Sequence, residues 1–338
     1  MKADTQLIDS GREEKWTQGG VNPVVQRAST MVFDSVSDMK HATANRAGDT
    51  LFYGRRGTTT TFALSKAMTE LEGGEGCALY PCGTAAITSA LLSFLKHGDH
   101  LLMVDNAYEP TRAFCDNMLK NLGISTTYYD PLIGKDIESL IQPNTRMLFL
   151  ESPGSNTMEI QDVPTLSTIA HQHDITVVLD NTWGSGLLFK PFDYGVDISI
   201  QAATKYIVGH SDAMLGTAVA NKKHWPRLRE NSYLLGQCAA PDDCYMALRG
   251  IRTLSVRLKQ HQQSALTVAQ WLKQQSIVKT VLHPAFEECP GHEFFKRDFS
   301  GSNGLFSFVV NCRDEEKITA MLDGFKHFKR GFSWGGFE

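Results

Sequence analysis

Short apolar segments alternate with helix-length segments through the middle of the chain. From about residue 60, this pattern predicts seven strands, at 77–81, 100–106, 124–130, 145–152, 175–181, 197–204 and 213–220. Most connections between them have the length and apolar content of helices, as at 84–97 and 163–174. Apolar strands that alternate with helices form a largely parallel sheet covered on both faces. We therefore expect an α/β domain whose site lies beyond the carboxyl ends of the strands.

The pattern changes after Pro241, where polar and apolar positions follow a long helical period. It predicts a helix over 242–275 with a break near Gly250. Two strands and a further helix are predicted beyond it, at 278–283, 305–311 and 314–325. This mixture is typical of an α+β domain. Because the sequence stops soon afterwards, at SWGGFE, we expect this domain to be incomplete.

The chain therefore divides into three parts. Residues 1–57 are polar, with little sustained periodicity, and predict an arm without a core of its own. Residues 58–245 form the α/β domain with its mostly parallel seven-stranded sheet, and residues 246–338 form the smaller α+β domain.

Composition narrows the classes of function. The 338 residues carry a formal net charge of -4, so no basic excess is available to bind nucleic acid. One uncharged run, 77–95, reaches membrane length, but Pro81 and Gly83 interrupt it, and a strand followed by a buried helix explains it better than a membrane span. Seven scattered cysteines without a CxxC pair argue against a zinc cluster or a disulfide scaffold. We expect a cytoplasmic protein with reduced thiols and no metal site.

Lys205 follows an uncharged run over residues 198–204 and stands at the end of a predicted strand. On this stretch alone, a lysine that simply emerges into solvent is the favoured interpretation. Asp180 ends the preceding apolar strand, 25 residues earlier. A carboxylate and an amine at the carboxyl ends of neighbouring strands can point into one cleft, although an exposed salt bridge between them is also possible.

A glycine at the start of a helix changes this balance. Gly83 stands between a strand and a long apolar helix, so the backbone N–H groups of Gly83 and Thr84 are placed to bind an anionic phosphate. A phosphate site, a carboxylate and a lysine in one cleft are what pyridoxal 5'-phosphate requires. The three features together favour a cofactor role for Lys205.

Seven segments of the chain, in order, resemble one enzyme family. They are YGRRGT, CGTAA, NAYEP, ESPGSNTMEIQDVP, DNTW, SIQAATKYIVGHSDAM and SWGG. Over about residues 4–338 they look like the Cys/Met-metabolism family of pyridoxal-phosphate enzymes, which has the fold type I, aspartate aminotransferase-like architecture. The long lysine motif and its spacing from DNTW are the most specific of these segments.

The resemblance implies roles for individual residues around the cofactor. Lys205 would hold it as a Schiff base, then remove the Cα proton of the substrate and later protonate the leaving thiolate. Asp180 would pair with the pyridinium nitrogen and keep it protonated. Gly83, Thr84 and the hydroxyl of Thr204 would bind its phosphate.

Other implied residues concern the ring, the substrate and a second subunit. Tyr108 would stack on the cofactor ring, contact the substrate and belong with Lys205 to the catalytic residues. Tyr53 and Arg55 would reach the phosphate of the neighbouring subunit, and Tyr53 would also contact the substrate, so a dimer, paired into a tetramer, is expected. Ser333 and Trp334 would line the substrate pocket.

The resemblance also implies a reaction. The forms SWGG and ESPGSN are similar to the β-eliminating branch, which favours α,β-elimination of L-cystathionine to L-homocysteine, pyruvate and ammonia in methionine biosynthesis. L-cystine and other S-substituted cysteines are possible substrates as well. Phe332 stands where a tyrosine is typical, which points weakly the other way.

Two alternatives stay open. One is a γ-lyase that acts on cystathionine or methionine, because γ-acting relatives share the cofactor site. The other is a pyridoxal-phosphate binder with little turnover, because family members continue past SWGG and supply an arginine for the substrate carboxylate.

Overall fold

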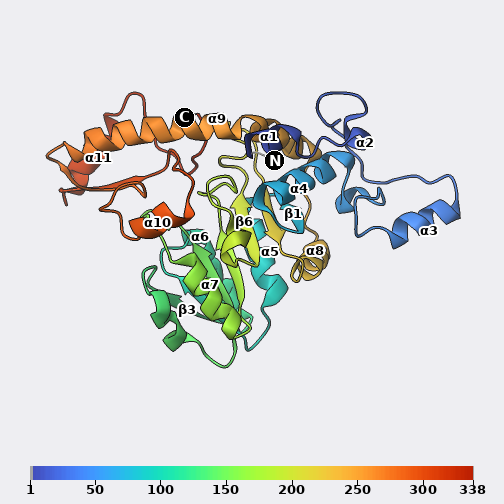
Figure 1. Ribbon diagram of the computed structural model, residues 1–338, viewed down its shortest axis with the longest axis horizontal. Helices are drawn as coiled ribbons and strands as arrows, with labels where there is room; N and C mark the ends of the chain where they lie inside the picture. The colour runs from blue at the N-terminus through green and yellow to red at the C-terminus, as the bar shows by residue number, and fades with distance from the viewer. Residues whose placement is uncertain (1–2, 338) are drawn as a thin grey trace.

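The computed structural model describes residues 3–337, and its body is a seven-stranded sheet (Figure 1). The strand order is β1-β7-β6-β5-β4-β2-β3. The pairings from β3 through β6 are parallel, whereas β7 is antiparallel to both of its neighbours. The strands are β1 (Gly76–Tyr80), β2 (His100–Val104), β3 (Ser125–Tyr129), β4 (Thr145–Glu151), β5 (Thr176–Asp180), β6 (Ile198–Ala202) and β7 (Gly216–Ala220). Each overlaps its predicted segment, and the α/β prediction is confirmed.

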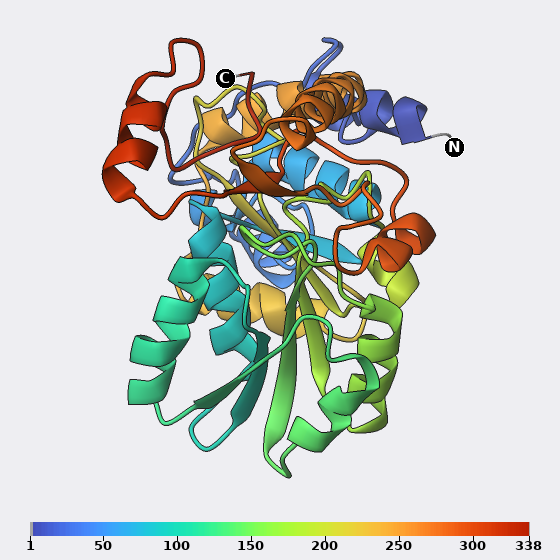
Figure 2. The same cartoon turned by 90° about the vertical axis from the view of Figure 1, so that its left-hand side faces the viewer.

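Helices cover both faces of the sheet, so its central strands are buried along most of their length. One face packs against α5 (Gly83–Phe94), α7 (Val163–Gln172) and α8 (Trp225–Leu234). The other packs against α4 (Thr59–Glu72) and α9 (Pro241–Lys273), which are adjacent to each other in Figure 2. Shorter elements complete the body: α6 (Glu109–Phe114) with a π-helical turn (Cys115–Leu119), and 3-10 turns at Gly134–Leu140 and Pro191–Tyr194.

Helix α9 is continuous, so the predicted break near Gly250 is wrong. Gly250 is buried, and a Cβ built on it would lie 2.0 Å from the carbonyl oxygen of Ile207. The glycine therefore serves close packing rather than a bend. Beyond α9 come the antiparallel strands β8 (Val278–Leu282) and β9 (Ser307–Val310), with α10 (His292–Asp298) and α11 (Glu315–Asp323).

The N-terminal region contains short helices that the hydrophobic pattern did not reveal. They are α1 (Ala3–Asp9), α2 (Glu14–Thr17), α3 (Val36–Ala44) and a 3-10 turn at Gly54–Arg56. Leu7 and Trp16 are buried against the body. Helix α3 projects away from it, with Ala42 as its one buried residue (Figure 1).

The uncharged run at 77–95 folds as β1 followed by α5. Within residues 3–337, no helix is both long and apolar enough to cross a membrane. Over the same residues the seven cysteines are free thiols.

Candidate active site

A cavity of about 450 Å³ opens at the carboxyl ends of β4, β5 and β6 and at the N-terminus of α5. It is lined by eight of the ten residues to which the family resemblance gives a site role: Gly83, Thr84, Tyr108, Asp180, Thr204, Lys205, Ser333 and Trp334. Strands β5 and β6 are parallel neighbours, with Asp180 opposite Ile200. Residues that follow the two strands therefore emerge at the same edge of the sheet.

Lys205 lies in the turn after β6 and is held by the C-terminal segment. Its Nζ donates a hydrogen bond to Ser333 Oγ at 2.8 Å and lies 5.3 Å from the centre of the Trp334 ring. The indole packs in turn on Tyr206, with ring centres 5.4 Å apart. A hydroxyl acceptor and an aromatic face both suit an ammonium group. Ser333 and Trp334 thus fix where the amine of Lys205 lies in the cavity.

Asp180 is buried at the end of β5 and bound by Thr182. The Thr182 N–H and hydroxyl donate to Asp180 Oδ1 at 3.0 and 2.5 Å. Burial raises the pKa of Asp180, while the two bonds from Thr182 and the charge of Lys205 act in the opposite direction. Such a carboxylate is well suited to a cationic partner such as a protonated ring nitrogen.

Glu151 is a cavity residue that the reading of the sequence missed. It ends β4 directly beside Asp180 of β5, and its Oε2 accepts a hydrogen bond from the Tyr108 N–H at 2.8 Å. Burial, and then the charge of Asp180, raise the pKa of Glu151 well above its ordinary value. The sequence contains an indication of this role, because Glu151 is a carboxylate at the end of a predicted strand, as Asp180 is.

The N-terminus of α5 forms one wall of the cavity. Cys82 caps the helix, its Sγ accepting from the Ala85 N–H at 3.4 Å, and Gly83 and Thr84 are the first two helical residues. Their N–H groups precede the first intrahelical bonds and carry the positive end of the helix dipole. A Cβ on Gly83 would lie 2.6 Å from the Cβ of Ala202, so only glycine lets α5 approach β6 this closely.

Thr204 is in the cavity wall, but its hydroxyl already has main-chain partners. Its Oγ1 donates to the carbonyl of Leu215 at 3.2 Å and accepts from the Leu215 N–H at 2.9 Å. The predicted contact between this hydroxyl and a phosphate therefore stays a prediction.

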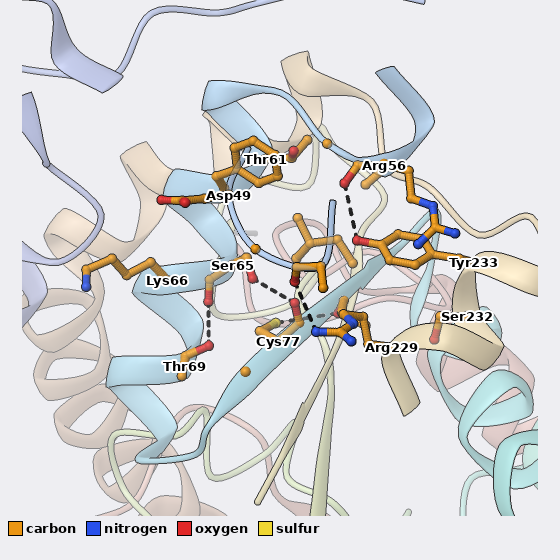
Figure 3. A pocket seen from close by; sticks show the side chains of 18 of the residues that line it. Asp49, Arg56, Thr61, Ser65, Lys66, Thr69, Cys77, Arg229, Ser232 and Tyr233 are labelled. Atoms are coloured by element: carbon orange, nitrogen blue, oxygen red, sulfur yellow. Dashed lines mark hydrogen bonds between the residues drawn. The ribbon is translucent and has the colours of Figure 1, made fainter. Parts of the chain in front are cut away.

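Tyr53 and Arg55 lie outside this cavity. Arg55 lines a second one, of about 380 Å³, between the arm, α4, β1 and α8 (Figure 3). It donates to the carbonyl of Tyr233 at 2.9 Å, and the neighbouring Arg56 lies 4.1 Å from the centre of the Tyr233 ring. Within one chain, Tyr53 and Arg55 are thus separated from the group of residues around Lys205.

The side chains around Lys205 fit pyridoxal 5'-phosphate. The cavity combines an amine, a buried carboxylate, an aromatic side chain and a helix N-terminus. These supply the covalent attachment, the ring-nitrogen partner, the stacking surface and the phosphate site that this cofactor needs. In the described residues, no group of three His, Cys, Asp or Glu side chains could hold a metal ion. The fold and the site together define a pyridoxal-phosphate enzyme of the α/β type.

Comparison with known proteins narrows this class. Residues 4–338 match the family described as Cys/Met metabolism PLP-dependent enzyme, and the chain belongs to that family. It is 59% identical to the cystathionine beta-lyase of Haemophilus influenzae over 99% of this chain and 85% of that protein. It is 55% identical to the cystathionine beta-lyase MetC of Escherichia coli over 100% of this chain and 86% of that protein.

A solved structure gives the same result for the fold. The crystal structure of metB from Corynebacterium glutamicum superposes with a TM-score of 0.93 at 26% sequence identity, covering 100% of this chain and 86% of that one. The predicted resemblance to the family and to its fold is confirmed.

Proposed function

We propose that this protein is a pyridoxal-phosphate-dependent carbon–sulfur lyase that cleaves L-cystathionine by α,β-elimination to L-homocysteine, pyruvate and ammonia. The observation that carries the proposal is the common cavity of Lys205, Asp180 and the α5 N-terminus, which Ser333 and Trp334 also line. The names of the relatives at 59% and 55% identity support the same reaction, and the matched family is described as one of Cys/Met metabolism. When bound, the cofactor would supply an electron sink for the carbanion formed at Cα.

The residues of the chain would bind, orient and move protons. Lys205 Nζ would accept the proton from the substrate Cα and later donate a proton to the departing thiolate. Ser333 Oγ, which lies 2.8 Å from Nζ, would orient the amine. Asp180, held by Thr182, would keep the ring nitrogen protonated. Tyr108, whose N–H is bound to Glu151, would stack on the ring and face the substrate.

Trp334 would set the size of the substrate pocket, and Gly83 and Thr84 would bind the phosphate through their N–H groups. The apolar indole next to the lysine would leave room for the thioether while excluding water from the reacting carbon. L-cystine and other S-substituted cysteines are proposed as weaker substrates, because discrimination between thioethers rests on few contacts.

We also propose that the protein works as a dimer or tetramer in the cytoplasm. Tyr53 and Arg55 lie away from the Lys205 cavity of their own chain, and they would reach the phosphate in a second subunit. The projecting helix α3 and the segment before it support such an arrangement, since the exposed apolar residues Val36 and Val32 would gain a partner there. The free cysteines fit a reducing compartment.

The test is to supply the purified protein with pyridoxal phosphate and L-cystathionine and to identify the keto acid. Pyruvate with homocysteine is the expected result. Release of 2-oxobutyrate with cysteine would instead make the protein a γ-lyase. Absence of any keto acid from protein with bound cofactor would contradict the lyase proposal.

A further inference from the structure

The loop that carries Lys205 is held by main-chain hydrogen bonds and by side chains that bind its main chain. It connects β6 to β7, with the Lys205 N–H bound to Ala202 O at 3.0 Å and the Gly209 N–H bound to Lys205 O at 2.8 Å. Tyr206, Ile207 and Val208 are buried against the α4 and α9 side of the sheet. The position of the Lys205 Cα therefore depends on the contacts between this loop and helix α9.

Arg257 of α9 makes that connection. Its Nη1 donates to Tyr206 O at 2.7 Å, and its Nη2 donates to Ile207 O at 3.4 Å and to Gly250 O at 2.7 Å. No carboxylate among the described residues lies within ion-pair distance of Arg257, so its charge is satisfied by carbonyl dipoles. Burial lowers the pKa of Arg257 to about 10, which still leaves it protonated near neutral pH.

Gly250 and Gly209 allow this close approach. Gly250 precedes Arg257 by two helical turns and lies on the same face of α9. A Cβ on Gly250 would lie 2.0 Å from Ile207 O, and one on Gly209 would lie 2.2 Å from Arg257 Nη1. The helix thus offers a notch for the loop and a guanidinium that binds its carbonyls. Gly250 lies against the carbonyls of Ile207 and Val208, and Arg257 binds those of Tyr206 and Ile207, so both contact the main chain just after Lys205.

We propose that Arg257 is a positioning residue for Lys205, which holds the main chain next to the lysine against α9 so that Nζ points into the cavity with Asp180. The inference rests on the proposed function of that cavity. The guanidinium acts through the loop, because its hydrogen-bond partners are main-chain carbonyls and the Thr253 hydroxyl, at 3.1 Å. A partly buried arginine that binds a loop at several points fixes its position more firmly than one contact does.

The same helix offers a matched control. Arg252 is also partly buried, and its Nη1 donates to two carbonyls, those of Leu7 and Ser10, at 2.7 and 2.8 Å. Burial lowers its pKa as it does that of Arg257. Those carbonyls belong to the N-terminal region, however, and not to the lysine loop. Replacing either arginine removes a partly buried guanidinium from α9, but only the replacement of Arg257 releases the main chain next to Lys205.

The experiment compares Arg257→Gln with Arg252→Gln. In the cofactor-loaded protein, we expect Arg257→Gln to lower kcat for L-cystathionine about tenfold or more, with a smaller change in KM, because a displaced amine transfers protons poorly. The pH midpoint of the absorbance change of the lysine-bound cofactor should shift as well. In cofactor-free protein, deuterium exchange should rise over residues 206–209. For Arg252→Gln, exchange should rise near residues 7–10, while kcat and the midpoint stay at the wild-type values.

Equal kcat and an equal midpoint in the two variants would overturn the proposal, as would wild-type exchange at 206–209 in Arg257→Gln. If the glutamine variant does not fold, Arg257→Lys decides, since an ammonium can bind only part of the carbonyl set. That variant should show a smaller loss of kcat, and wild-type values would refute the proposed role. If the wild-type protein releases no keto acid from L-cystathionine, the proposed reaction fails, while the absorbance and exchange measurements still decide whether Arg257 positions Lys205.

Discussion

At the scale of single residues, the proposed site depends on polar groups that are buried and hydrogen-bonded. Thr182 shows this most directly, because its hydroxyl donates to Asp180 and also accepts from the Ala202 N–H at 2.9 Å. One side chain thereby connects the carboxylate that ends β5 to the last residue of β6. Losing it would leave a buried N–H without this partner and a less firmly held carboxylate.

We therefore expect Thr182→Val to weaken the binding of pyridoxal phosphate about tenfold, which corresponds to the loss of about one hydrogen bond to a charged group. The measurement is a titration of the cofactor-free protein with pyridoxal phosphate, followed by absorbance. Thr168→Val is the control, since the Thr168 hydroxyl donates only to its own helix, at Pro164 O. Equal affinities in the two variants would show that Asp180 does not depend on Thr182.

Lys205 provides the second prediction at this scale. Lys205→Ala should lower keto acid release by about a thousandfold or more, because both the cofactor attachment and the proton carrier are lost. The matched variant is Lys222→Ala, which removes an exposed lysine after β7 and should keep wild-type activity. Product formation by the Lys205 variant at the normal rate would end the assignment of this lysine.

At the scale of secondary structure elements, tertiary contacts override local preference. Gly250 costs about 1 kcal/mol relative to alanine in a helix interior, yet α9 runs through it without a break. The packing of the lysine loop onto α9 explains the glycine.

Tertiary packing also buries a titratable side chain, that of His283, which follows β8. It is fully buried, its Nδ1 accepts from the Ala285 N–H at 3.1 Å, and its ring packs near Phe286 and Phe306.

The burial of His283 predicts a pH dependence of stability. Burial lowers the pKa of His283 from 6.5 to about 4, so the unfolded chain binds more protons between these values. Stability from this group is complete above pH 6.5 and is lost as the pH falls toward 4, by about 3 kcal/mol. His283→Asn should reduce the difference in urea unfolding midpoint between pH 7.5 and pH 5. The exposed His327, changed to Asn, should leave that difference as in the wild type.

At the scale of the whole molecule, the arm and the body have different relations to the site. Leu7 and Trp16 pack on the body of their own chain, whereas Tyr53 and Arg55 lie at the second cavity or beside it, away from Lys205. The proposed explanation is a site completed by another subunit. Such sharing makes activity depend on assembly in a way that mixed oligomers can reveal.

We expect Arg55→Ala and Lys205→Ala to be poorly active alone and partly active together. In a mixed dimer, one of the two sites would contain Lys205 from the first variant and Arg55 from the second. Random mixing should therefore leave about a quarter of all sites intact. Keto acid release after co-expression is the measurement. Activity no higher than that of the two separate variants would place Arg55 in the site of its own chain or outside any site.

The sequence by itself determined the seven strands, the helices between them and the strand-end positions of Lys205 and Asp180, because the periodicity of side-chain burial is a local property. It also indicated the anion site at Gly83, since a strand, a glycine and a helix are consecutive in the chain.

Only the tertiary structure decided which side chains from distant segments meet. It placed Glu151 beside Asp180, Ser333 Oγ against Lys205 Nζ, and the lysine loop in the notch at Gly250. It also docked α1 on α9, a contact that the hydrophobic pattern of the arm did not predict. These contacts join residues far apart in the chain, and they depend on strand order and on the packing of helices, which local patterns of hydrophobicity do not encode.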